Sequence, residues 1–403
     1  MFKQVMLPLI LIAIPLIAVV LLVTKHINYG LALFIGAIVI VLVSMMKPVI
    51  FLETVIEAVT DLETLELTSI VALIQILAIY MSDSGMIERL IDSIRKLLSA
   101  KAILAILPAI MGSLPMPGGA LLSAPMIDDT ADKLGLNSDE KSFINVWFRH
   151  WNFFVYPLSS AIILASTLSG VSLYNLIAVQ VPVLTLYVAA GYIAILRRVA
   201  NPRRYALDKR SWELVRRTLV NISPIAIAVT LTIIGLNMVI ALTVAIAYTI
   251  AITHMKLNEA LKALRKVNVS LPLAIPGVMI FRYTLNRSGL IDAALPYLSS
   301  VYLPPVFIAL AIAWIVGLAT AMPSAGIALV LPIASAIIGD MPTSTASAVY
   351  ISIIFSYLIS PLHLCLVLTV GYYRSSIYAV YKKLIPSAII VYLLSLIILS
   401  LMH

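Results

Sequence analysis

The sequence has 403 residues, of which 62% are hydrophobic and only 11% are charged. Water-soluble domains have about 25% charged and about 45–50% apolar residues, so this composition excludes a soluble fold. The formal net charge is +9, which in a membrane protein indicates Lys and Arg in cytoplasmic loops rather than a nucleic-acid-binding surface. The apolar residues form blocks of about 17–25, the length that crosses a hydrocarbon core as a helix. We therefore predict an all-α polytopic protein of the cytoplasmic (inner) membrane, surrounded by the lipid bilayer.

The first half, residues 1–196, is predicted to contain five transmembrane helices and one re-entrant helical hairpin. Residues 100–135 are apolar but are broken by the segment GSLPMPGG, Gly112 to Gly119, and each arm is too short to cross the membrane alone. Such a break within a membrane requires surrounding protein or a water-filled cavity. The long span 142–168 is interrupted at Tyr156-Pro157, and an amphipathic stretch, 48–66, is expected at the membrane interface. The spans are expected near 6–24, 29–46, 67–81, 142–168 and 173–196. We interpret the first block as a true span, since it lacks a cleavage pattern.

The second half, residues 218–403, is predicted to repeat this order. Its hairpin covers 304–339, with the tip TAMPSAG from Thr320 to Gly326, and its long span 343–370 is interrupted at Ser360-Pro361. The other spans are expected near 218–235, 237–254, 269–283 and 384–401. The halves therefore share one arrangement of five spans and one hairpin.

The two halves resemble each other in sequence at an offset of about 204 to 207 residues. For example, SGMIERL from Ser84 aligns with SGLIDAA from Ser288. Because the number of crossings per half is odd, the halves are predicted to be inverted repeats. Most Lys and Arg fall on the side of the basic linker 197–217, whereas the acidic stretch 53–66 falls on the other side. The positive-inside rule then predicts a cytoplasmic linker and two external termini.

Substrate and ion sites of inverted-repeat transporters form near the membrane midplane, where helices are broken. A half-helix N-terminus favours anions, and the carbonyls freed at a break suit a small cation such as Na⁺. Four breaks occur at matched places here, and polar residues cluster at them. The candidate substrate-binding residues are Ser113, Pro117, Gly118, Gly119, Arg149, Asn152, Tyr156, Thr320, Pro323, Ser324, Ser360 and His363. The candidate cation-binding residues are Ser113, Gly118, Asn152, Thr320, Gly326 and Ser360. Each of these Ser and Thr residues has an alternative, purely structural role, since such hydroxyls often bond to their own helix.

Arg149 is the sharpest single candidate, because a charge within a membrane span is costly and marks a pathway by default. Asn152 and Tyr156 follow at i+3 and i+7, so we expect all three side chains on one helix face, presented to one carboxylate. The alternative is an arginine that extends to the cytoplasmic interface. His150 and His363 are interpreted as packing or hydrogen-bonding residues rather than a proton relay.

Other chemistry is not supported by the sequence. Asp128, Asp129 and Asp132 end the first hairpin and are expected to be solvated or paired with Lys133 or a nearby Arg. Cys365 is the single cysteine, so we expect no disulfide and no cysteine-based or transition-metal site. No phosphate-binding loop, zinc motif or nucleophile elbow is present, so an enzyme is not expected and no cofactor is predicted.

The hairpin and broken-span segments resemble the ion transporter superfamily of secondary carriers. The resemblance rests on GSLPMPGGALLSAPMID, Gly112 to Asp128, and SPLHLCLVLT, Ser360 to Thr369. It is nearest to an archaeal and bacterial integral-membrane family of undefined function, related to the gluconate and dicarboxylate permeases. The resemblance implies scaffold and elevator-type transport domains, a homodimer, Na⁺ or H⁺ coupling and a carboxylate substrate. The sodium-dicarboxylate symporters have a Ser-Asn-Thr motif at each tip, where this chain has SLP and TAMPS, so neither specificity nor sodium coupling follows from the resemblance.

These observations together predict an ion-coupled secondary active transporter, a symporter, for a small organic anion. A channel or membrane receptor is the alternative, and an intramembrane enzyme a more distant one. A channel would lack saturable uptake driven by an ion gradient, and an enzyme would need a catalytic pair at membrane depth.

Overall fold

A computed structural model describes residues 2–114, 119–199, 209–298 and 303–402 of the chain. These residues form α-helices and one short π-helical segment, and no strand occurs among them. The predicted all-α class is confirmed in this part of the chain.

The first half contains two hairpin arms, α6 and α7, followed by a long helix that is broken into α8, α9 and α10. Its elements are α1 (Phe2–Thr24), α2 (Tyr29–Ser44), α3 (Pro48–Thr60), α4 (Leu62–Asp83), α5 (Met86–Leu97), α6 (Ala100–Ser113), α7 (Gly119–Lys133), α8 (Ser138–Arg149), α9 (Asn152–Val155), α10 (Ser160–Ser169), α11 (Leu173–Gly191) and the π-helical η1 (Tyr192–Leu196).

The second half follows the same order, with the hairpin α17–α18 and a broken helix, α19 and α20. Its elements are α12 (Lys209–Ile233), α13 (Met238–Thr253), α14 (Leu257–Leu264), α15 (Ala274–Arg287), α16 (Leu290–Leu298), α17 (Pro305–Thr320), α18 (Pro323–Ile338), α19 (Thr343–Ile359), α20 (Leu364–Tyr373) and α21 (Ile377–Leu401). As helices, arms of about 14–16 residues extend about 21–24 Å, which is shorter than a hydrocarbon core of about 30 Å.

The helix caps repeat along with the helices. Asn28 accepts hydrogen bonds from the first turn of α2, and Asn237 does the same for the corresponding helix α13. Ser172 caps α11, and Ser376 caps its counterpart α21. A polar cap satisfies backbone N–H groups that the first helical turn leaves without partners. The same type of polar N-cap therefore begins the corresponding helix in both halves.

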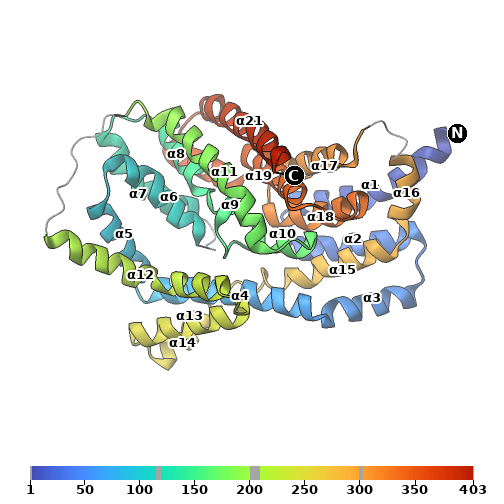
Figure 1. Cartoon of the computed structure of the whole chain (residues 1–403), viewed down its shortest axis with the longest axis horizontal. Coiled ribbons are helices and arrows are strands. Elements are labelled where there is room, and N and C mark those ends of the chain that lie inside the picture. The colour runs from blue at the N-terminus through green and yellow to red at the C-terminus, as the bar shows by residue number, and fades with distance from the viewer. Residues whose placement is uncertain (1, 115–118, 200–208, 299–302, 403) are drawn as a thin grey trace.

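The helices pack into two groups, each drawn from both halves of the chain. The flanking group consists of α1–α5 and α12–α16, and the central group of α6–α11 and α17–α21; most helix contacts lie within one group. In Figure 1 the helices of the central group cross the upper part of the view, while α3, α4, α12, α13 and α14 follow its lower margin. Each hairpin therefore packs mainly on the broken helices rather than on its sequence neighbours α5 and α16.

Contacts between the halves come in reciprocal pairs. Helix α2 packs on α15, and α13 packs on α4, which are the same two elements with the halves exchanged. The pairs α5–α12 and α16–α1, and the pairs α10–α18 and α20–α7, follow the same rule. Exchanging the two halves therefore preserves this pattern of neighbours.

Several elements differ from the expected ones. Three amphipathic helices, α5, α14 and α16, were not among the predicted elements. Helix α12 begins at Lys209 rather than near residue 218, and α4 begins at Leu62, so Glu63 and Glu66 belong to that helix and not to an interfacial segment. The span 142–168 begins earlier, at Ser138, and has a second interruption at His150-Trp151.

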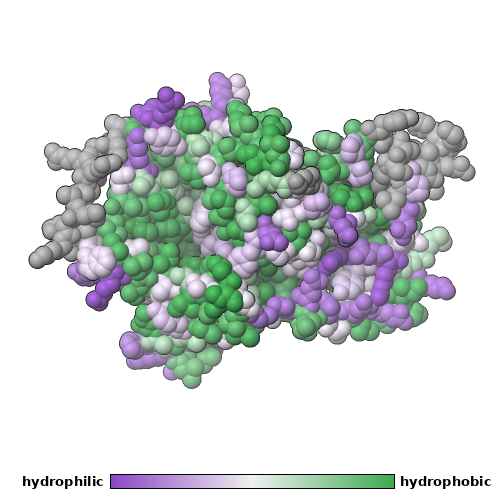
Figure 2. Space-filling model, viewed as in Figure 1, coloured by the Kyte–Doolittle hydropathy of each residue, from purple (hydrophilic) through white to green (hydrophobic). Residues whose placement is uncertain are grey.

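Six helical stretches of the described chain are long and apolar enough to cross a membrane. They are Leu62–Asp83, Ser138–Ser169, Leu173–Leu196, Trp212–Ile233, Thr343–Tyr373 and Ile377–Leu401. Figure 2 shows a broad hydrophobic face on the left and lower part of the molecule, and a hydrophilic patch at the right, over the region of α3 and α15. The chain is therefore a multi-pass membrane protein, while the predicted total of five crossings per half stays a prediction.

Candidate functional site

Both long helices are broken within the central group. Helix α8 ends at Arg149, α9 covers one turn, and the chain stays non-helical from Tyr156 until α10 begins at Ser160. In the second half, α19 ends at Ile359, and α20 begins only at Leu364. Both proline interruptions predicted from the sequence are therefore real helix breaks, as expected from the loss of the proline N–H.

Each break is hydrogen-bonded to the neighbouring hairpin. The Asn152 Nδ2 donates to the carbonyl oxygen of Gly112 at 3.0 Å, and the Ser360 hydroxyl donates to the carbonyl oxygen of Leu318 at 2.6 Å. Gly112 lies directly against the Arg149 carbonyl, and the corresponding Gly317 lies against Ser356, so neither glycine has room for a side chain. Glycine thus allows each first arm to approach a broken helix closely.

A cavity of about 110 Å³ lies where the first hairpin, the first break and the second hairpin meet. Such a volume holds about three or four water molecules. Its central-group lining includes Gly112, Ser113, Leu114, Asn152, Phe153, Tyr156, Leu158, Ser159, Ser160 and Ser324. Tyr29, Val71, Ile74, Gln75 and Leu271 complete it from the flanking side. The cavity therefore lies between the two helix groups.

The candidate residues divide into those that line this cavity and those that do not. Ser113, Asn152, Tyr156 and Ser324 come together in its wall. Thr320, Pro323, Gly326, Ser360 and His363 surround the second hairpin and second break and are not part of the lining. Gly119 is the first residue of α7, whereas Pro117 and Gly118 lie outside the described residues. Gln75 and Tyr29 were missed, although an amide inside an apolar span was a usable signal.

Several buried side-chain oxygens have no hydrogen-bond partner among the described residues, and two of them belong to residues directly at a helix break or a hairpin tip. These two are Asn152 Oδ1 and Thr320 Oγ1. The Thr320 hydroxyl lies beside Gly326, because a Cβ added to that glycine would be 3.7 Å from it. A buried oxygen without a partner is costly, and it gains most from a ligand that accepts its lone pair, such as a cation. One such oxygen belongs to each half of the chain.

Arg149 is buried, with 6% of its surface exposed. Among the described residues it makes no ion pair, and the one hydrogen bond of its guanidinium runs from Nη1 to Ser123 Oγ at 3.5 Å. It lies between the two hairpin arms, beside Gly112 of α6 and Ser123 of α7, and does not line the cavity. The expected common helix face with Asn152 and Tyr156 is wrong, because α8 ends at Arg149 itself.

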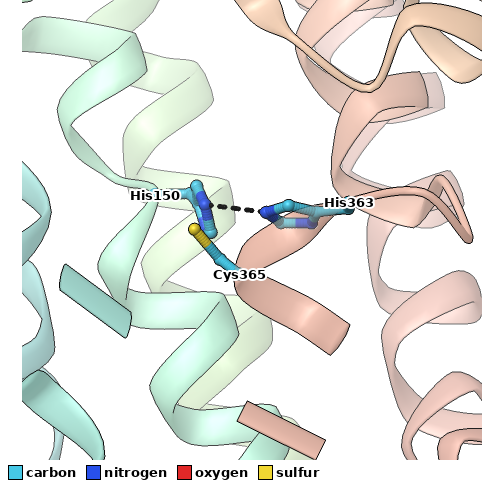
Figure 3. A group of neighbouring side chains, drawn as sticks. All are labelled: His150, His363 and Cys365. Carbon is cyan, nitrogen blue, oxygen red and sulfur yellow. Dashed lines mark hydrogen bonds between the residues drawn. The ribbon is translucent and has the colours of Figure 1, made fainter. Parts of the chain in front are cut away.

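His150 and His363 meet across the two breaks, with their Nε2 atoms 3.2 Å apart. The Tyr357 hydroxyl lies 3.2 Å from His150 Nε2, and Cys365 points toward the same place (Figure 3). Sequence reasoning treated these residues separately, since 213 residues separate the two histidines. No local sequence pattern predicts a contact between residues so far apart in the chain.

The acidic residues at the end of the first hairpin form ion pairs with a different partner from the one expected. Lys141 Nζ lies 2.5 Å from Asp128 Oδ1 and 2.6 Å from Asp132 Oδ1. The partner is therefore Lys141 of α8 and not Lys133 or an arginine. These contacts fasten the second hairpin arm to the broken helix.

A second cavity, of about 550 Å³, adjoins the first and shares Ser113, Leu114 and Tyr156 with it. Its lining is almost wholly apolar and comes from α5, α6, α11 and α12, with α4 and the first broken helix. The polar cavity therefore opens beside an apolar space between the two helix groups.

This chain matches a protein family in sequence and a solved structure in fold. A family described as "Protein of unknown function (DUF401)" matches residues 8–402. Among solved structures, the YdaH transporter of Alcanivorax borkumensis matches with a TM-score of 0.61 and 14% identity, over 86% of this chain and 87% of that one. No curated protein matches the sequence. At this identity the likeness shows a shared fold.

Proposed function

We propose a transport function for this chain, which belongs to the DUF401 family. The function that fits best is that of an ion-coupled secondary active transporter, a symporter of a small organic anion, a carboxylate. The observation that carries this proposal is the cavity of about 110 Å³, lined in part by hydroxyl and amide side chains, at which both hairpins and the first helix break meet, between two helix groups. A site at broken helices between repeats is typical of secondary transporters. The fold shared with a protein described as a transporter supports it further.

The proposed architecture is a pair of inverted repeats that work by an elevator mechanism, as in the ion transporter superfamily. The reciprocal contacts between the halves and the repeated caps support a duplication with internal twofold symmetry. In this proposal the flanking group is the scaffold and the central group moves as the transport domain. The cavity then lies at the boundary that opens to either side, and a homodimer joins two scaffolds.

The proposed topology has a cytoplasmic linker at 197–217 and external termini. The charge distribution supports it, since the linker 197–217 is strongly basic and the stretch 53–66 is acidic. Within the acidic stretch, Glu63 of α4 and Glu57 of α3 form ion pairs with Arg282 and Arg287, respectively. Cysteines introduced into the linker should be labelled only from the cytoplasm, and cysteines within 53–66 only from outside. Labelling of both from one side would contradict the inverted arrangement.

The proposed coupling ion is Na⁺ or H⁺. The unpartnered oxygens of Asn152 and Thr320 support two cation places, one at the tip near Ser113 and one between Thr320, Gly326 and Ser360. Carbonyl and side-chain oxygens at broken helices are the usual ligands of a coupling Na⁺.

The proposed substrate charge is negative because Arg149 is buried without an ion pair among the described residues. An unpaired charge within a membrane is expensive, so a carboxylate is the natural partner. Arg149 and the cavity both contact Gly112. The Gly112 contact is made by the Arg149 carbonyl and Cγ, while the guanidinium is directed to Ser123, so we propose that the hairpin or the arginine side chain moves when an anion in the cavity is bound.

A thermal-shift screen of small carboxylates, with and without Na⁺, tests the proposal. We expect at least one carboxylate to raise the melting temperature of the purified protein, and the increase to be larger with Na⁺ or at lower pH. At a concentration about 100 times its dissociation constant, a ligand stabilises by about 2.7 kcal/mol. Stabilisation only by neutral or cationic compounds would contradict the anion proposal, and gradient-independent flux through the protein would favour a channel.

A further inference from the structure

The strongest cluster of ligand atoms outside the cavity consists of His150, His363 and Cys365. His150 follows the last residue of α8, His363 precedes α20, and Cys365 is the second residue of α20. Both histidines are fully or almost fully buried, and the ligand atoms of all three residues lie within 4.8 Å of one another. Figure 3 shows the two rings meeting edge to face, with the Cys365 sulfur beside His150. The cluster joins the two halves at the crossing of their broken helices.

Backbone carbonyls determine which nitrogen of each ring carries the hydrogen. His150 Nδ1 lies 2.6 Å from the Val146 oxygen, and His363 Nδ1 lies 3.2 Å from the Leu358 oxygen. A carbonyl oxygen only accepts, so each neutral ring has its hydrogen on Nδ1 and its lone pair on Nε2. The two Nε2 atoms then direct lone pairs toward each other across 3.2 Å. That arrangement is repulsive unless a hydrogen-bond donor or a cation satisfies at least one of the two lone pairs.

The same arrangement is the usual support of a histidine that binds a metal. A ligating imidazole generally donates its other N–H to a carbonyl or carboxylate, which fixes the ring orientation. Metal–nitrogen distances of about 2.0–2.1 Å and a separation of 3.2 Å between the nitrogens give an N–metal–N angle of about 105°. A three-coordinate ion ideally has angles of about 120°, which at these bond lengths corresponds to about 3.5 Å between the nitrogens, so the rings need to separate by only a few tenths of an ångström to share one ion.

We propose that His150, His363 and Cys365 form a three-coordinate site for a soft monovalent cation, copper(I). Thiolate and imidazole donors suit Cu⁺ and Zn²⁺ better than hard cations. Binding releases the thiol proton to solvent, so a Cu⁺ thiolate complex is neutral, whereas Zn²⁺ leaves one net positive charge. Arg149, the neighbour of His150 in the chain, is also buried and positive, and an uncompensated buried charge is expensive. Charge balance and the three donors therefore both favour Cu⁺.

This site was not expected, because a single cysteine is normally insufficient for a metal site. Two histidines from opposite halves complete the donor set only after folding. Tyr357, whose hydroxyl is 3.2 Å from His150 Nε2, supplies a hydrogen-bond donor to that lone pair when no ion is bound. Binding of copper does not depend on whether the chain is a transporter.

The test is a titration of the purified full-length protein with Cu⁺ under reducing, oxygen-free conditions, in competition with a chromogenic Cu⁺ chelator. We expect one ion per chain, one proton released, and an X-ray absorption spectrum with two nitrogen ligands and one sulfur ligand. Cys365→Ser should weaken binding at least 100-fold, and His363→Asn at least tenfold. His26→Asn is the matched control, because His26 is exposed and its positive φ of 62° is one that asparagine tolerates.

Three outcomes of these measurements would contradict the proposal. Unchanged Cu⁺ affinity in Cys365→Ser, or a spectrum without sulfur, would exclude this site. Tighter binding of Zn²⁺ than of Cu⁺ would overturn the choice of ion. Melting temperatures of the variants without metal identify any that fail to fold, and Cys365→Ser keeps the size of the side chain, so a folded variant remains available for the comparison.

Discussion

Replacement of Arg149 by alanine is expected to reduce the affinity for the substrate carboxylate at least 100-fold. The guanidinium is buried, and its one hydrogen bond among the described residues is the 3.5 Å contact with Ser123. Most of its five N–H donors therefore remain available for a ligand in that part of the chain. A bidentate pair of charged groups contributes more than a neutral hydrogen bond, so its loss should be large.

The lysine variant separates this account from its alternative. Lysine keeps the charge but loses the planar fork, so Arg149→Lys should bind about tenfold more weakly than the wild-type protein. An arginine that merely extends toward headgroups would be replaced by lysine without loss. The measurement is calorimetric affinity for the carboxylate found by the thermal-shift screen. Arg217→Ala, which removes only an exposed pair with Glu213, is the control, and wild-type affinity in Arg149→Ala would exclude an anion role.

Replacement of Thr320 by valine is expected to abolish most of the stabilisation that Na⁺ gives to the protein. Valine has the same shape and lacks the hydroxyl, whose oxygen is buried without a partner among the described residues. If the hydroxyl binds no ion, its removal should stabilise the fold by about 1 kcal/mol and leave the sodium effect unchanged. If the hydroxyl is a Na⁺ ligand, the Na⁺ concentration that gives half of the maximal stabilisation should rise about tenfold in Thr320→Val.

Thr284 provides a matched control for this experiment. It is also buried with an unpartnered hydroxyl in the described chain, but it lies in α15 of the flanking group. Thr284→Val should change stability without changing the response to Na⁺. Asn152→Ala, which removes the second unpartnered oxygen, should weaken the sodium response as Thr320→Val does. Equal sodium responses in all three variants and the wild type would exclude Na⁺ at these oxygens.

The features that the sequence predicted well depend on local chemistry. Helix α6 ends at Ser113 and α7 begins at Gly119, and Pro157 and Pro361 lie in real breaks, so hairpins and broken helices were predictable from residue type. The internal similarity was also visible, because both halves place polar and small residues at the same elements. The apolar blocks gave most of the long helices within a few residues.

Other features depend on tertiary contacts that no local pattern shows. Helix α5 has a regular apolar stripe, but it is short and carries charges, so the search for long apolar spans does not find it. The common face of Arg149, Asn152 and Tyr156 assumed a continuous helix, but the break at His150 places Asn152 and Tyr156 outside α8, to which Arg149 belongs. The meeting of His150, His363 and Cys365 brings together both halves of the chain. Such contacts become visible only when the two broken helices are packed together.

In the proposed function this chain moves an organic anion together with a cation. The most direct test is uptake of the radiolabelled carboxylate from the thermal-shift screen into proteoliposomes, with imposed gradients of Na⁺ or H⁺. We predict saturable uptake that one of these gradients drives above the equilibrium level and that Arg149→Ala abolishes. Uptake that is unchanged when both gradients are removed, and that only equilibrates the carboxylate, would contradict ion-coupled transport.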